Sequence, residues 1–548
     1  MRTLGRLGLV FSLAARALAC TDGDAPEAVA PVLATDPADA FAPPSDGGAA
    51  IEAEADGGVD ANAPNIVASA SGTVEVFVNG LSLGRTNAPG AELLRTSMLP
   101  SGENVIVLRA TKGGASAPFA VAEIGGVFGK ARTSARWKAK AATAAESTEP
   151  VGAWAKPDFD DAAWSRATEA ASKIWTANAG DDVVLLRLRL YVPPGFSADV
   201  PVGFGHAVTG GLGGPIVDVA TTTELAQAVA GTTPRIVRVN GTIDFTGTEG
   251  PITSQACVQA MQCPAPMKTE YIEDILGYCD GKPTFPFTYD KAGTKPLVVG
   301  SNKTIIGAGV DATIKGKGLT VSGGAQNVVI RNLTISDINP QIVWGGDAIH
   351  LDDADGVWID HVRIARIARQ MLVTGKGKAT NVTFSWNELD GRTPYASFCD
   401  GAHYWAMLLV GAPDSITVND NWIHDTSGRG PHAGGLPGAS NTGHFVNDYY
   451  ENVPGQAVEA LTSATNLRFE GTYFENVRTP FKDEADPGHV YAPLGSNVGK
   501  PVNGSFPVDQ AALMAFANVP AAAVAISYPA EHVPNAVPHL AGPGHIRF

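Results

Sequence analysis

The stretch NVVIRNLTISDI at 327–338 decides the fold, because the chain repeats its pattern five more times. The later copies are GVWIDHVRIARI (356–367), NVTFSWNELDG (381–391), SITVNDNWIHDT (415–426), TGHFVNDYYENV (442–453) and NLRFEGTYFENV (466–477). Each copy alternates apolar strand positions, passes through a polar or Asn turn and continues into a second short strand. One copy cannot bury its apolar face alone, whereas stacked copies share a continuous core. The repeats therefore predict a right-handed parallel β-helix.

The sequence before the repeats fits the same architecture. From residue 202 it gives a glycine-rich opening, a strand, a short amphipathic helix expected around Thr223 to Ala230, and strands in RIVRVNGTIDF (235–245) and KTIIGAG (303–309). The leucine-rich repeat is the rival solenoid, but its L-x-x-L-x-L skeleton is missing. We therefore expect an all-β chain in which residues 202–548 form the β-helix domain.

Residues 65–197 have the pattern of a separate β-sandwich module. TVEVFVNG (73–80), NVIVLRAT (104–111) and VVLLRLRLYV (183–192) alternate apolar and polar residues, and the Asn79-Gly80 pair indicates a hairpin. The segment is similar to the galactose-binding-like modules attached to bacterial carbohydrate enzymes. Its tryptophans, Trp154, Trp164 and Trp175, are expected in the core rather than as a platform for sugar.

Residues 1–20 are typical of an export signal. Arg2 and Arg6 precede an apolar run, Leu7 to Ala15, that is too short for a permanent membrane span. The run leads to Ala-Leu-Ala-Cys, which is similar to a bacterial lipoprotein cleavage box and makes Cys20 a candidate lipidation site. A secreted or cell-surface protein is expected, with an outer-membrane lipid anchor at Cys20. The alternative is ordinary signal cleavage, with Cys20 incidental.

The net charge of −16 is unevenly distributed over the 548 residues. Residues 21–64 hold ten acids and no Lys or Arg in an Ala/Pro-rich stretch, which predicts a disordered linker. No basic stripe is present in the sequence, so no nucleic-acid partner is expected. A monomer is expected.

The four remaining cysteines are Cys257, Cys263, Cys279 and Cys399. An even number in an exported chain favours two disulfides, for which three pairings are possible. Three of the four lie in a segment without regular periodicity, so we expect a loop-like insert that needs covalent pinning. No Cys/His spacing suggests zinc.

Five motifs then carry a family resemblance. They are GGDAI (345–349), WIDH (358–361), ARIARQ (365–370), CDGAHYW (399–405) and SGRGP (427–431). In this order and spacing they resemble the pectin lyases of polysaccharide lyase family 1, over roughly Gly203 to Val477. WIDH is shared with pectate lyases, whereas ARIARQ and CDGAHYW favour the pectin lyase branch.

The resemblance implies cleavage of α-1,4-linked, methyl-esterified galacturonan by β-elimination. The reaction removes the C5 proton, expels the C4 oxygen and leaves a 4,5-unsaturated oligogalacturonate. Arg369 stands where calcium-using relatives need a metal, so no metal and no other cofactor is expected. A fixed guanidinium near the carbonyl oxygen would stabilise the developing charge by roughly 3–4 kcal/mol.

The resemblance gives roles to six further residues. Arg429 would take the C5 proton, although arginine is a poor base, and the alternative is that it steers charge while water or hydroxide abstracts the proton. Asp347 would support the arginines, and the aromatic side chains of Trp344, Tyr404 and Trp405 would suit neutral, esterified rings. His432 is a substrate-binding candidate where the family usually has lysine, which puts subsite preference in doubt.

The resemblance also implies the disulfide pairs Cys257–Cys279 and Cys263–Cys399. Other residues have plain structural explanations: His361 of WIDH is expected to stack inside a coil or to bond backbone. Asp352, Asp353 and Asp355 are expected to be solvated loop acids rather than calcium ligands.

Two alternative functions stay open from the sequence. One is a calcium-dependent pectate lyase, and the other is a non-catalytic surface β-helix that binds pectin. A polygalacturonase-type hydrolase shares the scaffold, but its paired-Asp and Gly-His-Gly pattern is not evident.

Overall fold

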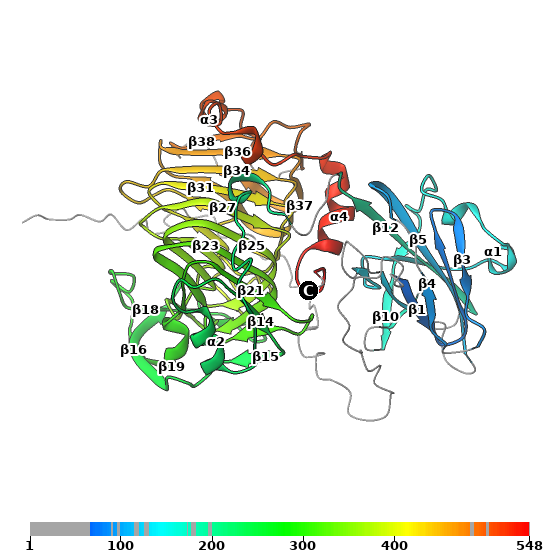
Figure 1. Ribbon diagram of the computed structural model, residues 1–548, viewed down its shortest axis with the longest axis horizontal. Coiled ribbons are helices and arrows are strands. Elements are labelled where there is room, and N and C mark those ends of the chain that lie inside the picture. Colours follow the sequence, from blue (N-terminus) through cyan, green and yellow to red (C-terminus); the bar gives the residue numbers. More distant parts are fainter. Residues whose placement is uncertain are drawn as a thin grey trace, which may run out of the picture.

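The computed structural model describes residues 66–88, 91–95, 99–113, 120–124, 131–171, 174–176, 182–194, 200–482, 487–499 and 504–546. The predicted signal, the acidic linker and Cys20 lie outside these residues. Within them the chain is almost entirely β-structure, with few and short helices (Figure 1). No helix in these ranges is long and apolar enough to cross a membrane.

The first part of the chain forms two antiparallel sheets. One sheet contains β1 (Ile66–Ala70), β4 (Leu93–Arg95), β6 (Ala120–Ile124), β7 (Ala131–Arg132), β10 (Thr168–Ala171) and β11 (Ile174–Thr176). The other has the order β3-β2-β5-β12-β8-β9, with β2 (Val74–Val78), β3 (Leu81–Arg85), β5 (Gly102–Thr111), β8 (Lys138–Ala141), β9 (Ser165–Arg166) and β12 (Val183–Val192). This is the β-sandwich that precedes the β-helix.

Local features of the sandwich follow from its sequence. Asn79 and Gly80 join β2 to β3 with φ of 50° and 83°, the left-handed conformation that a two-residue type I′ turn requires. Trp154 and Trp164 are buried together with Phe77, so these two tryptophans are core residues as predicted. The structure does not describe the side chain of Trp175. Two short helices, α1 (Ala144–Thr148) and η2 (Ala153–Ala155), lie in the segment between β8 and β9. The relation to galactose-binding-like modules stays a prediction.

The second part of the chain is a parallel β-helix, and the predicted fold class is confirmed. Its 21 strands are β13 (Ile216–Val219), β14 (Arg235–Val239), β15 (Thr242–Asp244), β20 (Leu297–Val299), β21 (Lys303–Gly307), β22 (Thr313–Lys315), β23 (Leu319–Ile338), β25 (Ile349–Ile367), β26 (Leu372–Thr374), β27 (Ala379–Ser385), β28 (Glu388–Asp390), β30 (Met407–Leu409), β31 (Asp414–Asn419), β32 (Trp422–His424), β33 (His432–Ala433), β34 (Asn441–Val446), β35 (Tyr449–Ala460), β36 (Thr465–Glu470), β37 (Tyr473–Phe481), β38 (His489–Tyr491) and β39 (Val498–Gly499). Helix α2 (Thr222–Val229), with a Thr221/Glu224 capping box, lies at the start of this part near the predicted place.

The six sequence repeats are six successive coils. Equivalent apolar positions pair in parallel register along the series Val328, Val357, Val382, Ile416, Gly443 and Leu467. The turn after each first strand needs a positive φ, which Asn332 (55°) and Asn447 (55°) adopt readily. His361 occupies the same turn with φ 52°, is fully buried and bonds Asp360 through Nδ1 at 2.8 Å. Its ring also stacks on that of Trp386, with 6.1 Å between ring centres, so the predicted stacking is confirmed, whereas its hydrogen bond goes to a side chain and not to backbone.

The cysteine-rich insert is loop-like around Cys263 and Cys279, but strands that the sequence did not predict flank these irregular segments. Strands β16 (Pro251–Val258), β18 (Tyr271–Glu273), β19 (Phe285–Asp290) and β24 (Ile342–Val343) form a four-stranded sheet. The short β17 (Lys268–Thr269) pairs in parallel with β29 (Tyr395–Ala396) in a separate two-stranded sheet. Polar residues on the exposed face of β16 hide the strand pattern, because only one face packs against apolar neighbours.

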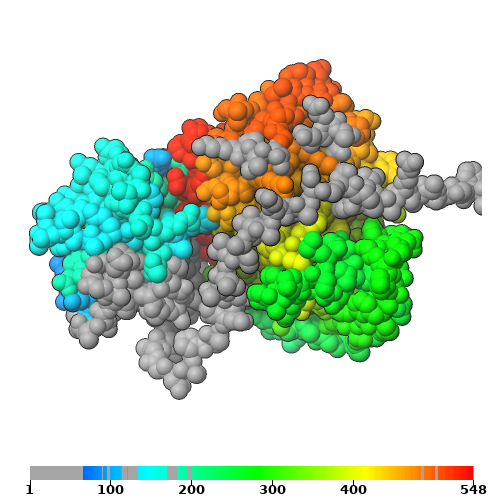
Figure 2. Space-filling view, turned by 180° about the vertical axis from the view of Figure 1, so that it is seen from behind, coloured from blue at the N-terminus to red at the C-terminus, as the bar shows by residue number. Residues whose placement is uncertain are grey.

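The C-terminal segment covers the junction between the two parts. After β39 come α3 (Gln510–Ala515), η5 (Ala521–Ala523), η6 (Ala530–His532) and α4 (Val533–Leu540). Helix α4 lies between β12 and the β-helix (Figure 1), and Figure 2 shows the same red segment between the sandwich and the later coils. Val533, Val537 and Leu540 share one buried cluster with residues of both parts. The sandwich is therefore packed onto the β-helix rather than merely tethered to it.

Candidate active site

Asp347 and Arg369 form a two-pronged ion pair on neighbouring coils. The Arg369 backbone N–H donates to the Gly346 carbonyl, which places the two side chains side by side. Arg369 donates from Nε to Asp347 Oδ1 at 2.9 Å and from Nη2 to Oδ2 at 2.7 Å. The backbone N–H of Gln370 adds a 2.8 Å bond to Oδ1. This geometry fixes the guanidinium plane and leaves Nη1 for a ligand.

Trp344 and a small cavity complete this end of the site. The Arg369 guanidinium carbon lies 4.1 Å from the centre of the Trp344 ring, which is a cation–π contact. A cavity of about 210 Å³ opens here, lined by Gly293, Thr294, Pro296, Trp344, Gly346, Asp347, His350 and Arg369. The paired charges of Asp347 and Arg369 nearly cancel, so this cavity suits an uncharged group better than a free carboxylate.

Arg429 stacks on the other predicted aromatic residues. Its guanidinium carbon lies 4.5 Å from the Trp405 ring centre and 5.7 Å from that of Tyr404. Its backbone has a positive φ of 53°, which turns the chain sharply after Gly428. The buried Arg429 Nε has no hydrogen-bond partner among the described residues. A buried, unpartnered donor at this place can be satisfied by a ligand.

Coil spacing puts the two arginines on one face. The coil of Arg369 is followed by the coil of Trp405, through the bond from Met371 N–H to the Trp405 carbonyl, and then by the coil of Arg429. Adjacent parallel strands lie about 4.8 Å apart, so the two arginine backbones are about 10 Å apart. Trp344, Tyr404 and Trp405 pack against one apolar cluster around the Cys257–Cys279 disulfide. The three predicted aromatic residues thus share one cluster, and the two arginines stack on its members, Arg369 on Trp344 and Arg429 on Trp405.

His432 lies next to Arg429 and is bonded to a residue that sequence analysis missed. Its Nδ1 bonds Glu459, which also contacts Gln456 and, at 3.5 Å, Lys482. Burial lowers the pKa of His432 against the raising effect of Glu459, and nearby Arg429 lowers it further. Glu459 pairs in register with His432 on β35, so aligning the coils could have found it.

Two disulfides support the cleft. Cys257 bonds Cys279 and Cys263 bonds Cys399, which are the pairs that the family resemblance implies. The second pair joins residues 136 positions apart and ties the insert to the loop that carries Tyr404 and Trp405. Covalent pinning on this scale reduces the entropy that the loop would otherwise lose on folding.

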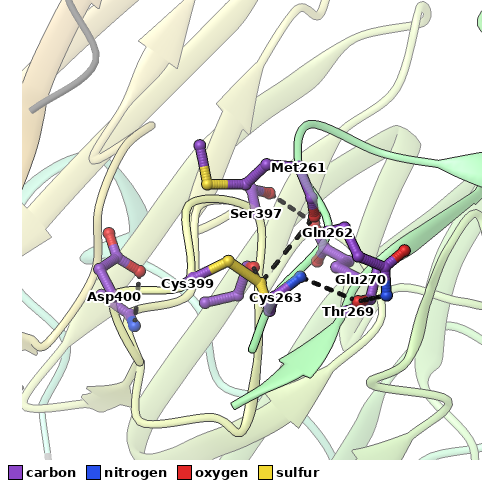
Figure 3. Close-up of a disulfide and its surroundings, with 10 residues drawn as sticks. Met261, Gln262, Cys263, Thr269, Glu270, Ser397, Cys399 and Asp400 are labelled. Carbon is purple, nitrogen blue, oxygen red and sulfur yellow. Dashed lines mark hydrogen bonds between the residues drawn. A yellow bond between two sulfur atoms is a disulfide. The ribbon is translucent and has the colours of Figure 1, made fainter. Parts of the chain in front are cut away.

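A buried acid, Glu270, lies behind the aromatic wall, by which we mean Trp344, Tyr404 and Trp405. Figure 3 shows Glu270 and Ser397 next to the Cys263–Cys399 disulfide, with the Ser397 hydroxyl donating to the Glu270 carboxyl group. Burial raises the pKa of Glu270 to about 8, and Asp400 acts in the same direction. Glu270 is therefore protonated and uncharged at neutral pH. No motif marked it, because its burial depends on contacts 127 positions away.

A second missed residue, His403, holds Arg369 from behind. Burial lowers the pKa of His403 to about 4, so the imidazole is neutral at neutral pH. Its Nε2 lies 2.8 Å from the Arg369 backbone carbonyl, to which the neutral tautomer donates. His403 lies inside the CDGAHYW motif, directly before Tyr404 and Trp405, but the motif did not mark it as a functional residue.

One group of acidic and histidine side chains outside the active site has donor atoms close enough together to bind a metal ion. Glu388, Asp390 and His424 are the described group closest to a metal-binding arrangement. Burial alone would lower the pKa of His424, but Asp390, Asp425 and Glu388 raise it to about 9, which favours the protonated ring. Arg363 and Arg392 already bond Asp390. Asp352 and Asp355 lie within β25 rather than in a loop, and both accept bonds from the next coil.

The comparisons with known proteins agree with this geometry. A family model described as "Pectate lyase" matches residues 272–393. "Probable pectin lyase F" of Neosartorya fischeri is 45% identical over 288 residues, covering 52% of this chain and 74% of that protein. "Pectin lyase B" of Emericella nidulans is 41% identical over 280 residues, covering 50% of this chain and 72% of that protein.

A solved structure is also similar, although too distantly to add to the assignment. It is a pectate lyase from Bacillus sp. N165 in complex with trigalacturonate, with a TM-score of 0.41 and 19% identity over 63% of this chain and 99% of its own. The sequence relatives carry the conclusion. The chain belongs to the pectin lyases of polysaccharide lyase family 1.

Proposed function

We propose that this protein is a pectin lyase that cleaves methyl-esterified α-1,4-galacturonan by β-elimination. A base takes the proton from C5, electrons form the C4–C5 double bond, and the C4 oxygen leaves with the departing chain. The products are a new reducing end and a 4,5-unsaturated oligogalacturonate. This is a polysaccharide lyase reaction, and it uses no water to split the glycosidic bond.

One observation carries the proposal, namely the Asp347–Arg369 ion pair stacked on Trp344. Deprotonation at C5 puts negative charge on the carbonyl oxygen, which needs a donor fixed in advance. Arg369 Nη1 is such a donor, because Asp347 holds the other two guanidinium nitrogens. The neutral ester leaves one negative charge to stabilise, whereas a free carboxylate would leave two.

Arg429 is proposed to act at the C5 side of the same sugar. Its stacking on Trp405 and its unpartnered Nε support a contact with the reacting ring. Two routes for the C5 proton follow: Arg429 itself accepts it, or Arg429 holds a hydroxide that does. The dependence of the rate on pH, measured in H2O and D2O, separates the two routes. With hydroxide as the base the rate rises tenfold per pH unit without a plateau, whereas with Arg429 as the base it levels off once Arg429 is deprotonated.

The aromatic residues and His432 are proposed to bind the polymer. Trp344 and Tyr404 are partly exposed and would offer ring surface to uncharged, esterified sugars, whereas Trp405 is buried and would position Arg429. A neutral His432 beside Arg429 lacks the positive charge of a lysine at this place. The +1 charge that would attract a neighbouring free carboxylate is therefore missing, and a high-ester substrate is favoured.

The experiment that tests the function follows the ultraviolet absorbance of the unsaturated product. High-ester pectin and polygalacturonate are compared, each with and without a calcium chelator. We expect product from pectin at a rate that the chelator leaves unchanged. Activity on polygalacturonate alone, abolished by chelator, would establish the calcium-dependent alternative, and absence of product from either would leave the non-catalytic one.

Export and anchoring are proposed on the sequence alone. The segment 1–20 supports secretion, and Ala-Leu-Ala-Cys supports lipidation at Cys20 as the finer proposal. The mass of the mature N-terminus tests both. A diacylglyceryl-modified Cys20 supports the anchor, whereas an unmodified end supports plain secretion. Metal independence and a monomeric state stay predictions, tested by the chelator assay and by light scattering.

A further inference from the structure

A second cavity lies where the sandwich meets the β-helix. It has a volume of about 170 Å³, and five of its lining residues are cations, Arg136, Lys138, Arg166, Arg187 and Arg189. We call it the junction pocket. It is lined by residues of β12 and α4 and shares no lining residue with the cavity at Arg369.

Three of these cations stand in one row across the sheet. Strand pairing places Arg187 of β12 opposite Lys138 of β8, and Lys138 opposite Arg166 of β9. Side chains of directly paired residues point to the same face, about 5 Å apart. Arg189, two residues beyond Arg187, points to that face as well. Like charges directly opposite each other destabilise a sheet, so this row needs compensating anions.

The protein supplies too few anions to this row. One carboxylate, Asp161, accepts bonds from Lys138 at 2.8 Å, from Arg189 at 3.1 Å and from Arg187. Glu103 reaches Arg189 at 4.0 Å. Arg166 is exposed and forms no ion pair within the described part of the chain. Four cations therefore face two carboxylates, which leaves an excess of two positive charges.

The β-helix side of the pocket cancels only part of this excess. Arg136 is bonded to Glu451 and lies 4.4 Å from the Trp422 ring centre, so that pair balances itself. The Glu475 carboxylate accepts a hydrogen bond from the neutral Tyr449 hydroxyl and offsets one positive charge, so the pocket keeps an excess of one. Burial, with help from Arg136, lowers the pKa of His539 to about 3, so His539 is neutral. The pocket thus combines enclosure with unbalanced positive charge.

We propose that the junction pocket binds the free carboxylates of unesterified galacturonan. The inference rests on the proposed function, which supplies a uronate polymer as the ligand class. Arg166, with a whole guanidinium available, would hold one carboxylate in a bidentate pair. Lys138, whose Nζ spends two of its three protons on Asp161, would contribute the third.

This second site would complement the active site. The cleft, with its paired charges and aromatic faces, takes the ester form of the polymer, whereas the junction pocket takes the acid form. A chain of mixed esterification would engage both, so the pocket would hold the enzyme on partly de-esterified pectin through an increased effective concentration.

The test measures trigalacturonate binding by calorimetry at low salt, where charge contacts are strongest. Arg166→Gln is expected to weaken binding by about tenfold, the loss of one charge-assisted contact. Lys138→Gln is a second variant with the same expectation. Lys156→Gln, an exposed lysine of the same module outside the pocket, is the matched control and should leave binding unchanged. Circular dichroism verifies that each variant is folded.

Trp344→Ala separates the two sites, because it alters the cleft only. Trigalacturonate binding that survives Trp344→Ala and is lost in Arg166→Gln supports the pocket. The reverse pattern, or equal binding of the fully methyl-esterified trimer or of inorganic phosphate, overturns it. Arg166→Gln should still release product from fully esterified pectin at the wild-type rate. If the wild type releases none, the proposed function fails, while the binding comparison still decides on the pocket.

Discussion

The active site and the junction pocket differ in how their cations are paired with carboxylates. In the cleft, Arg369 is matched by Asp347 with two bonds, 2.9 and 2.7 Å long, and lies on an aromatic ring. In the junction pocket Lys138, Arg187 and Arg189 share the single carboxylate of Asp161. A balanced arginine directs a hydrogen bond to a neutral carbonyl, whereas unbalanced cations attract an anion.

The comparison teaches that counting cations is a poor guide to ligand charge. The arginines of the cleft suggest an anionic ligand until their partners are considered. The buried acid Glu270 does not change this charge balance, because it is protonated at neutral pH and adds no negative charge. The predictions below test each of these points, starting with the largest effect.

Removal of Arg369 should have the largest effect. We expect Arg369→Ala to lower kcat on high-ester pectin by roughly 10²–10³-fold, which is the loss of one preorganised charge-stabilising donor. Steady-state product absorbance measures it. The matched control is Arg366→Ala, since Arg366 forms the same two-pronged pair with Asp337 at 2.6 and 2.8 Å outside the cavity. Equal losses in both variants would show that the ion pair is only structural.

Removal of the partner should convert the balanced cleft into an unbalanced one. We expect Asp347→Asn to lower kcat/KM on high-ester pectin by roughly 10–100-fold, because Arg369 loses its charged, two-pronged anchor. The variant should also bind polygalacturonate more tightly than the wild type does. Inhibition constants for oligogalacturonate measure this change, with Asp337→Asn as the control. Unchanged inhibition would contradict the charge-balance argument.

The protonated acid behind the wall should give a pH dependence of stability. Because burial raises the folded-state pKa of Glu270 to about 8, above its unfolded value near 4.5, its stabilising contribution is complete below about pH 4.5 and is lost as pH rises to about 8. Glu270→Gln removes this loss, so its Tm should fall less between pH 5 and pH 8 than that of the wild type. Thermal unfolding across this range measures it. Parallel curves for both proteins would contradict a neutral Glu270.

The smallest effect is expected at His432. His432→Lys places a cation beside Arg429 and should improve KM for partly de-esterified pectin by roughly fivefold, which is about 1 kcal/mol for one added charge pair. The rate on fully esterified pectin should stay the same. His350→Lys, at another position lining the cleft, is the control. A change that is equal on both substrates would indicate altered folding rather than altered charge.

The sequence predicted the β-helix because its repeats share one pattern of apolar and turn residues, and their equivalent positions pair from Val328 to Leu467. It also marked Asp347, Arg369 and Arg429, which motifs identify locally. It missed the sheet around β16, whose polar exposed face mimics a loop. It missed Glu270 and Glu459 as well, because their roles arise from partners on other coils. The charge row of the junction pocket depends on strand register, which no local pattern reveals.

The most direct test of the account is the initial rate of unsaturated-product formation on high-ester pectin, measured with wild type and Asp347→Asn in the presence of a calcium chelator. We predict full chelator-resistant activity for the wild type and a loss of roughly 10–100-fold for the variant, since the charge-balanced Arg369 stabilises the negative charge that develops on the carbonyl oxygen. Activity that needs calcium, or that survives Asp347→Asn unchanged, would contradict it.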